Sequence, residues 1–164
     1  MNIHAKTMRL AESDNINTDV IIAGKYTKTL DYNEMASHLF EDMGPALAGQ
    51  MKGKVLVAGR NFGCGSSREQ APLALKYGGC CAVVASSFAR IFYRNAINIG
   101  LPVIIADTDS IAAEENIEID LLGGKIIVGK DRVVSAAPMP KIMLDIFSAG
   151  GMVEYMKAHG SFEM

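Results

Sequence analysis

Three short runs of apolar residues stand out in the middle of the chain: KVLVAG at 54–59, CCAVVAS at 80–86 and LPVIIAD at 101–107. Continuous β-rich runs of this length are typical of strands that are covered on both faces. The segments between them, 67–79 and 87–100, are each long enough for a helix and each end in glycine, a common helix stop. This alternation predicts a central β-α-β-α-β unit with parallel strands and right-handed crossovers.

The N-terminal third has a weaker pattern. Residues 7–12 (TMRLAE) alternate and predict a first strand, and residues 15–24 (NINTDVIIAG) predict a loop that leads into a short apolar strand. Residues 31–44 predict a helix, because Asp31 and Glu34 have the spacing of a capping box and a glycine closes the segment. The apolar stripe of this helix is expected at Met35, Leu39 and Phe40.

The last third changes to alternating patterns. Residues 117–129 form two alternating runs around a Gly-Gly pair, which predicts a β-hairpin, and residues 131–136 predict a third strand. Residues 141–160 predict one or two helices, broken at a second Gly-Gly pair. The pattern as a whole predicts a single α/β domain over residues 1–164, in which a C-terminal hairpin and helices are added to the parallel unit.

The composition agrees with such a domain. Of the 164 residues, 49% are hydrophobic and 21% are charged, so the chain can build a core. The formal net charge of −2 and the pI near 5.9 argue against general binding to nucleic acid or to an anionic membrane. No apolar run approaches the roughly 18 residues that span a bilayer, and the N-terminus lacks the pattern of a signal peptide. We therefore expect a cytoplasmic protein.

The cysteines and histidines do not predict a metal site. Cys64, Cys80 and Cys81 form no CxxC pair, and no Cys/His spacing suits zinc. An odd number of cysteines without a signal peptide fits free thiols in a reducing compartment. Cys64 has no histidine near it in sequence to act as its base, so we interpret it as a packed residue rather than a nucleophile. No metal ligand is assigned to this chain.

Residues 59–70, GRNFGCGSSREQ, form the joint between the run at 54–59 and the next helix. The glycines allow tight turns and a close approach of the backbone to a ligand. Ser66, Ser67 and Arg68 are expected at the start of the helix and beyond the carboxyl end of a parallel strand, where free N–H groups favour an anion. Arg68 is suited to hold a carboxylate through two parallel hydrogen bonds. The alternative is that one serine only caps the helix.

The long stretch 59–104, together with NTDVI at 17–21, resembles the small subunits of 3-isopropylmalate dehydratase. This family includes the small subunits of homoaconitase and the swivelling domain of aconitase. The resemblance covers nearly the whole chain, and the segments NFGCGSSRE and SFARIFYRNAINIG match over long ungapped runs. It implies a swivelling β/β/α domain and a large partner subunit that carries a 4Fe–4S cluster, in a heterodimer or heterotetramer. It also implies a hydro-lyase that isomerises a hydroxy-dicarboxylic acid by dehydration and rehydration.

The resemblance also implies roles for three residues. Ser66 matches the serine that acts as the base, whereas Ser67 and Arg68 match residues that bind a substrate carboxylate. A serine is a poor base unless fixed positive charge and N–H groups stabilise its alkoxide. The glycine-rich joint beside Arg68 is a setting of this kind.

The loop 24–31, GKYTKTLD, matches the segment that contacts the variable substituent of the substrate, and its candidate substrate-binding residues are Tyr26, Lys28 and Thr29. Lys28 either meets a second carboxylate as a point charge or lies on the surface. Ala23 replaces the proline that is usual in the family. We expect 3-isopropylmalate, and thus leucine biosynthesis. Homoaconitate, citraconate or citramalate, and 2,3-dimethylmalate are alternative substrates, and a stand-alone dicarboxylate-binding module is the alternative of a different class.

Overall fold

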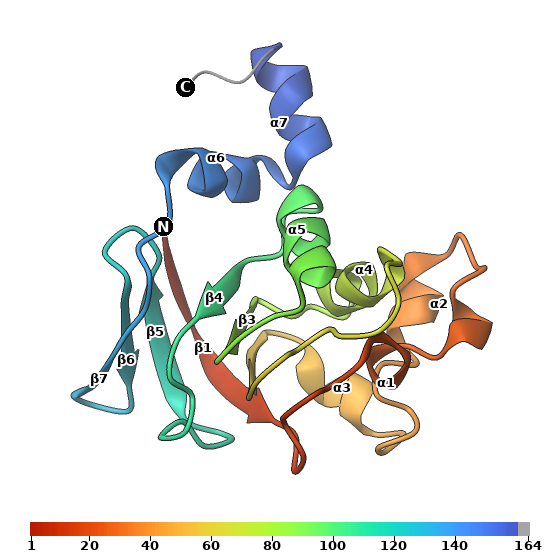
Figure 1. Cartoon of the computed structure of the whole chain (residues 1–164), viewed down its shortest axis with the longest axis horizontal. Helices are drawn as coiled ribbons and strands as arrows, with labels where there is room; N and C mark the ends of the chain where they lie inside the picture. The colour runs from red at the N-terminus through yellow and green to blue at the C-terminus, as the bar shows by residue number, and fades with distance from the viewer. Residues whose placement is uncertain (161–164) are drawn as a thin grey trace.

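A seven-stranded mixed sheet organises residues 1–160, the part of the chain that the computed structural model describes (Figure 1). The strand order across the sheet is β4-β3-β2-β1-β5-β6-β7. The strands are β1 (Asn2–Arg9), β2 (Lys54–Ala58), β3 (Ala82–Ala85), β4 (Val103–Ile105), β5 (Asn116–Asp120), β6 (Lys125–Val128) and β7 (Arg132–Ser135).

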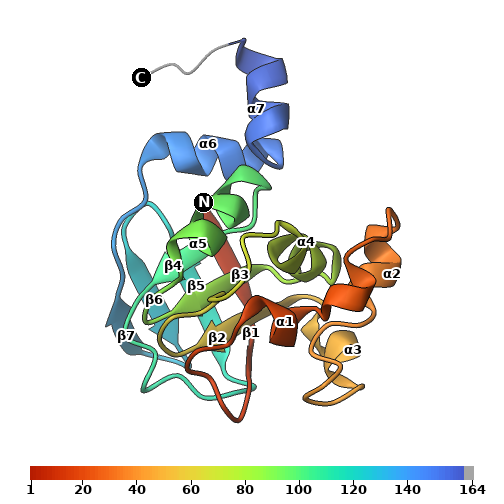
Figure 2. The ribbon, with the colours of Figure 1, turned by 45° about the vertical axis from the view of Figure 1, so that its right-hand side comes forward.

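The strands β1 to β4 run parallel to one another. Helix α4 (Gln70–Tyr77) connects β2 to β3, and helix α5 (Arg90–Asn98) connects β3 to β4. The register places Val57 opposite Val84 and Val84 opposite Ile104, and all three side chains are buried. The two helices pack side by side (Figure 2). The predicted β-α-β-α-β unit is therefore confirmed, and its apolar runs form strands that are mostly buried, with Ile105 of β4 exposed.

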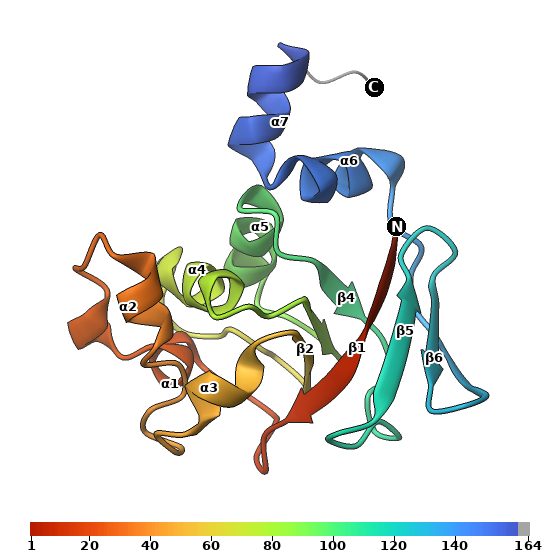
Figure 3. The same cartoon turned by 180° about the vertical axis from the view of Figure 1, so that it is seen from behind.

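Strand β1 joins the parallel half of the sheet to an antiparallel half (Figure 3). It pairs with β2 on one side and with β5 on the other, and it begins at Asn2, earlier than predicted. The strands β5, β6 and β7 form an antiparallel meander, which confirms the hairpin predicted over 117–129 and the third strand after it. A bridge between Ala106 and Ala136 joins the ends of the two outer strands, so the sheet is curled.

Two helices follow the sheet, α6 (Lys141–Ala149) and α7 (Met152–His159). They are separated, as predicted, at Gly150 and Gly151, whose φ angles of +92° and +135° favour glycine. Lys76 holds this corner: its Nζ donates to the carbonyl of Gly150 at 2.8 Å and to a carbonyl at the end of α5 at 2.5 Å. Partial burial lowers the pKa of Lys76. No helix in the described part of the chain is long and apolar enough to cross a bilayer.

The strand predicted within residues 15–24 is wrong. This segment forms the short helix α1 (Thr18–Ile21), followed by a 3-10 turn, η1 (Gly24–Tyr26). Asn17 starts α1, because its Oδ1 accepts a hydrogen bond from the N–H of Val20 at 2.9 Å. A good cap at the head of an apolar run therefore decides its conformation, although the run itself is rich in β-branched residues.

The helix predicted after Asp31 is shorter than expected. Helix α2 spans only Tyr32–Ala36, and the chain then turns through Phe40, whose φ of +55° is incompatible with a continuing helix. Asp31 caps α2 as predicted, since its Oδ1 accepts from the N–H of Glu34 at 3.1 Å. A further short helix, α3 (Leu47–Met51), was not predicted. The predicted apolar stripe is fully buried: Met35, Leu39 and Phe40.

Candidate active site

The loop that follows β2, residues 59–66, is held along one side by the segment after β1. The N–H of Asn15 donates to the carbonyl of Arg60 at 2.8 Å, and the N–H of Gly63 donates to the carbonyl of Ile16 at 2.7 Å. The loop therefore has backbone partners beyond the end of its strand, as buried backbone groups require.

The segment 86–89, which follows β3, holds the loop along its other side. The N–H of Phe62 donates to the carbonyl of Ser87 at 3.0 Å, and the N–H of Ala89 donates to the carbonyl of Phe62 at 2.9 Å. The N–H of Asn61 donates to the Ser87 hydroxyl at 2.8 Å. The parallel backbone pairing of β2 and β3 thus continues beyond the ends of these strands, and it holds the loop in place.

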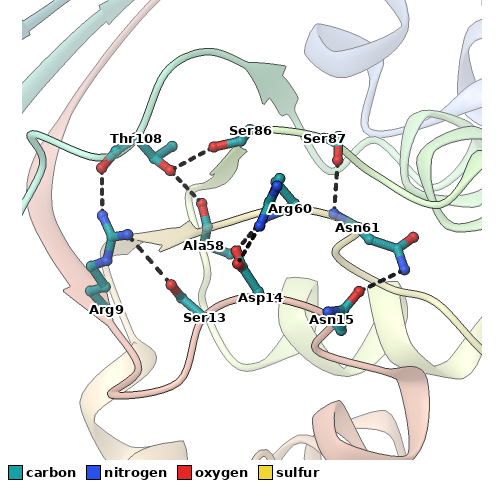
Figure 4. Close-up of polar contacts among 10 residues, drawn as sticks. All are labelled: Arg9, Ser13, Asp14, Asn15, Ala58, Arg60, Asn61, Ser86, Ser87 and Thr108. Carbon is teal, nitrogen blue, oxygen red and sulfur yellow. Dashed lines mark hydrogen bonds and ion pairs between the residues drawn. The ribbon is translucent and has the colours of Figure 1, made fainter.

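Side chains also tie the strand ends together at the base of this loop (Figure 4). The Thr108 hydroxyl donates to the carbonyl of Ala58 at 2.7 Å and lies 3.0 Å from the Ser86 hydroxyl. Arg9 donates to the carbonyl of Thr108 at 2.5 Å and reaches the Ser13 hydroxyl at 3.4 Å. The carboxyl ends of β1, β2 and β3 are therefore linked through the loop after β4.

Asp14 fixes the first residues of the loop. Its Oδ1 accepts from the N–H of Arg60 at 2.7 Å, and its Oδ2 lies 3.4 Å from the Arg60 guanidinium. A Cβ atom on Gly59 would lie 1.9 Å from Oδ1, so this contact requires glycine at position 59. Both charged residues also line a wider surface depression of about 700 Å³. The Arg60 side chain is 78% exposed there.

The backbone hydrogen bond from Arg60 holds the pKa of Asp14 below its ordinary value of 3.8. Asp14 therefore contributes stability that is present above pH 3.8 and is lost as the pH falls through its folded-state pKa. We expect Asp14→Asn to lower the melting temperature at pH 7, and we expect this difference to shrink when both proteins are melted near pH 3. Arg60→Ala keeps the backbone N–H, which is the main cause of the lowered pKa of Asp14, so this variant should retain most of the pH dependence of the melting temperature. If Arg60→Ala lost as much of this pH dependence as Asp14→Asn, the account would be contradicted.

Gly63 lies in the middle of the loop against an aromatic cluster. Its φ is +80°, and a Cβ atom there would lie 2.2 Å from Cγ of Phe92. The ring of Phe92 packs edge-on against Phe62, which is fully buried, and stacks parallel to Phe88. The loop and α5 are therefore in van der Waals contact with no space between them, which makes the glycine a packing requirement.

Ser66 is half-buried at the outer end of the loop. Its N–H donates to the Thr18 hydroxyl at 3.1 Å, and its own hydroxyl accepts from the N–H of Arg68 at 3.2 Å. The carbonyl of Ser67 accepts from the Asn95 side chain on α5 at 3.3 Å. The prediction that these residues begin the helix is wrong: α4 starts at Gln70 after Glu69, and Ser66 to Arg68 lie in an irregular segment before it.

A small hollow lies between α1, the loop after it and the start of α4. Its volume of about 10 Å³ accepts about one water-sized group. Ser66 and Arg68 both line this hollow. Gln70 lines it as well, and its Oε1 atom is buried without a hydrogen-bond partner in the described part of the chain. The full lining is Thr18, Asp19, Ile22, Thr27, Ser66, Arg68, Gln70 and Ala71.

The loop after α1 brings none of its three predicted residues, Tyr26, Lys28 and Thr29, to the hollow. The Tyr26 hydroxyl donates to Glu41, and the Thr29 hydroxyl donates to Glu34 at 3.2 Å. Lys28 is exposed and lies outside the lining. Thr27 is the residue of this loop that lines the hollow, with its hydroxyl donating back to a loop carbonyl at 2.7 Å. Sequence reasoning missed Thr27, because the fold of η1 decides which loop residue points inward.

The cysteines are free, and their surroundings suit packing. Burial raises the pKa of the Cys80 thiol to about 12, and burial also raises the pKa of Cys81. The Cys64 thiol is half-buried and lies 3.6 Å from the carbonyl of Asn15, beside the loop. Within residues 1–160 no three His, Cys, Asp or Glu side chains are grouped so that they would hold a metal ion. The described residues therefore do not fit an iron–sulfur cluster.

Fold and site together define an α/β domain with a curled mixed sheet, which presents a serine and an arginine at the end of a hydrogen-bonded loop beyond its parallel strands. The family described as the aconitase C-terminal domain matches residues 3–108. The chain belongs to this family, in agreement with the resemblance carried by its motifs.

The relatives with similar sequences include small subunits of 3-isopropylmalate dehydratase and of homoaconitase. A 3-isopropylmalate dehydratase small subunit from Caldicellulosiruptor bescii is 50% identical over 148 residues, which cover 88% of this chain and 89% of the relative. A methanogen homoaconitase small subunit from Methanothermobacter thermautotrophicus is 51% identical over 146 residues, covering 87% and 84%. The crystal structure of 3-isopropylmalate dehydratase (leuD) from Methanocaldococcus jannaschii superimposes with a TM-score of 0.90 at 44% identity, covering 98% and 96%. The fold expected from the resemblance is therefore confirmed.

Proposed function

We propose that this chain is the small subunit of a 3-isopropylmalate dehydratase, a hydro-lyase that works only with a large subunit. The observation that carries the proposal is that Ser66 and Arg68 line the same hollow, at the end of a loop whose backbone is hydrogen-bonded on both sides. The family membership and the names of the relatives support it. Because the hollow accepts only about one small group, we infer that a partner surface completes the substrate site.

In this proposal Ser66 is the base that removes a proton from carbon. Its hydroxyl oxygen already accepts a hydrogen bond from the Arg68 N–H at 3.2 Å, and a fixed donor of this kind also stabilises the alkoxide. The Arg68 side chain adds positive charge, and together with Ser67 it binds a substrate carboxylate. The large subunit is proposed to carry the 4Fe–4S cluster, which supplies a Lewis acid for the leaving hydroxyl.

The lining of the hollow favours an uncharged substituent on the substrate. Ile22 and Ala71 are buried beside it, and the loop residue in its lining is the neutral Thr27, whereas Lys28 lies outside. An additional carboxylate would need a cation besides Arg68, which this proposal assigns to the first carboxylate. The homoaconitase alternative rests on Lys28, whose exposed ammonium is free to meet a carboxylate when a partner covers this face.

The test is reconstitution with an iron–sulfur-loaded large subunit, followed by the appearance of the unsaturated acid. We expect the highest kcat/KM for 3-isopropylmalate, lower values for homoaconitate, citramalate and 2,3-dimethylmalate, and the same ranking for Lys28→Ala. A ranking led by homoaconitate that collapses in Lys28→Ala would support the alternative substrate instead. Calorimetry on the isolated chain should show weak or no dicarboxylate binding; tight binding without a partner would favour a stand-alone binding module.

A further inference from the structure

We propose that Thr18 is a positioning residue that aims the Ser66 hydroxyl, and this inference rests on the proposed role of Ser66 as the base. Thr18 is 5% exposed, one of three buried polar residues in the described part of the chain. It lies at the start of α1, in a segment far from the loop in sequence, yet it lines the same hollow as Ser66. A buried hydroxyl requires a polar partner, and the partner here is the backbone of Ser66 itself.

Two hydrogen bonds made by Thr18 lie on either side of Gly65 in the loop. The Thr18 N–H donates to the carbonyl of Cys64 at 2.8 Å, and the Thr18 hydroxyl accepts from the N–H of Ser66 at 3.1 Å. Gly65, the residue between these two contacts, has no Cβ and therefore few steric limits of its own, and its φ is +103°. Thr18 thus fixes the chain immediately before and after Gly65, and it sets the direction in which Ser66 leaves the backbone.

Thr18 is itself held in place and can transmit this constraint. Its carbonyl accepts from the N–H of Ile22 at 3.0 Å, and Asn17 before it caps α1 and bridges to Cys64. A Cβ atom on Gly65 would lie 3.4 Å from the Thr18 hydroxyl oxygen, which shows how closely the two segments approach. Without the hydroxyl, the Ser66 N–H loses its acceptor and the turn is free to rotate about Gly65.

The experiment uses the complex with the large subunit and measures kcat and KM per assembled enzyme. Thr18→Val keeps the shape of the side chain and removes its hydroxyl. We expect kcat to fall by about 10- to 100-fold, the loss typical of a misplaced reacting group, with KM little changed. Thr18→Ser restores the hydroxyl and should restore kcat. A reduced kcat in Thr18→Ser, or a wild-type kcat in Thr18→Val, would overturn the proposal. If Thr18→Val does not assemble with the large subunit, Thr18→Ala replaces it in the comparison.

Thr7→Val is the matched control, because it also removes a buried threonine hydroxyl. Thr7 is fully buried and bonds the carbonyl of Ala112 at 2.6 Å and the N–H of Glu115 at 3.0 Å, away from the hollow. It should lower stability without lowering kcat, and an equal loss of kcat in both variants would make the Thr18 effect merely structural. The same kinetics distinguish a failure of the proposed function from a failure of the Thr18 proposal. If Ser66→Ala keeps turnover, the proposed function is wrong. If Ser66→Ala is inactive but Thr18→Val is fully active, only the role of Thr18 is refuted.

Discussion

Replacing Ser66 by alanine is expected to reduce kcat of the reconstituted enzyme by about 10²- to 10⁴-fold, the range typical for loss of a general base. The change removes one half-buried oxygen that accepts a hydrogen bond from the N–H of Arg68, so the chain should fold and assemble as before. KM should change little, because Ser67 and Arg68, the residues proposed to bind the carboxylate, are unchanged. Steady-state kinetics and a melting curve on the same preparation check both parts of the prediction.

Ser135→Ala is the matched control for this variant. Ser135 is exposed at the end of β7, on the antiparallel half of the sheet, and its replacement should leave kcat at the wild-type value. Turnover in Ser66→Ala that equals turnover in Ser135→Ala would sink the proposed mechanism, while the fold assignment would stand on its own evidence.

Of the substitutions proposed for this protein, Gly63→Ala is expected to cause the largest loss of stability. The new Cβ would lie 2.2 Å from Cγ of Phe92 and 2.5 Å from its Cβ, so a rotation of the ring alone does not relieve the overlap. Overpacking of this kind costs about 1–3 kcal/mol, and a left-handed alanine adds about 1–2 kcal/mol. For a chain of this length the melting temperature should fall by roughly 4–20 °C, measurable by calorimetry.

Gly129→Ala separates these two contributions. Gly129 has a φ of +68°, close to that of Gly63, but a Cβ atom added there would meet no atom within 4 Å outside its chain neighbours. Its loss of stability should therefore be the backbone part alone, about 1–2 kcal/mol. Equal melting temperatures for the two variants would show that the loop can move away from Phe92, and the rigid support described for Ser66 would then be wrong.

The parts of the fold that were predictable are those with a strong local signal. The continuous apolar runs at 54–59, 80–86 and 101–107 indicated the parallel strands, since only a doubly covered sheet buries such runs. The segment 15–24 was misassigned because its apolar run is short and a single Asn17 side chain, as the cap, selects the helix. The helix after Asp31 ended early at a positive φ that no pattern of hydrophobic residues reveals.

The candidate site was predictable where its residues are neighbours in sequence. Ser66 and Arg68 were expected together, and both line the hollow. Thr18 and Gln70 were not singled out, because the first reaches the hollow through a bridge between distant segments and the second is distinguished only by a buried, unpaired oxygen. Pairings between segments so far apart in the chain depend on the topology of the sheet, and local periodicity carries no information about them. The substrate-binding roles of Ser67, Lys28 and the other loop residues remain predictions for the kinetic tests above.

The position of β1 has a consequence for synthesis on the ribosome. The first strand to be translated becomes the middle of the sheet, and Lys6 pairs with Lys54 on one side but with Asn116 on the other. At typical rates of about 5–20 residues per second, roughly 5 to 20 seconds separate the emergence of β1 from that of its antiparallel partner. During that interval one edge of β1 stays unpaired, so products truncated before β5 should aggregate or recruit chaperones far more readily than the 164-residue chain.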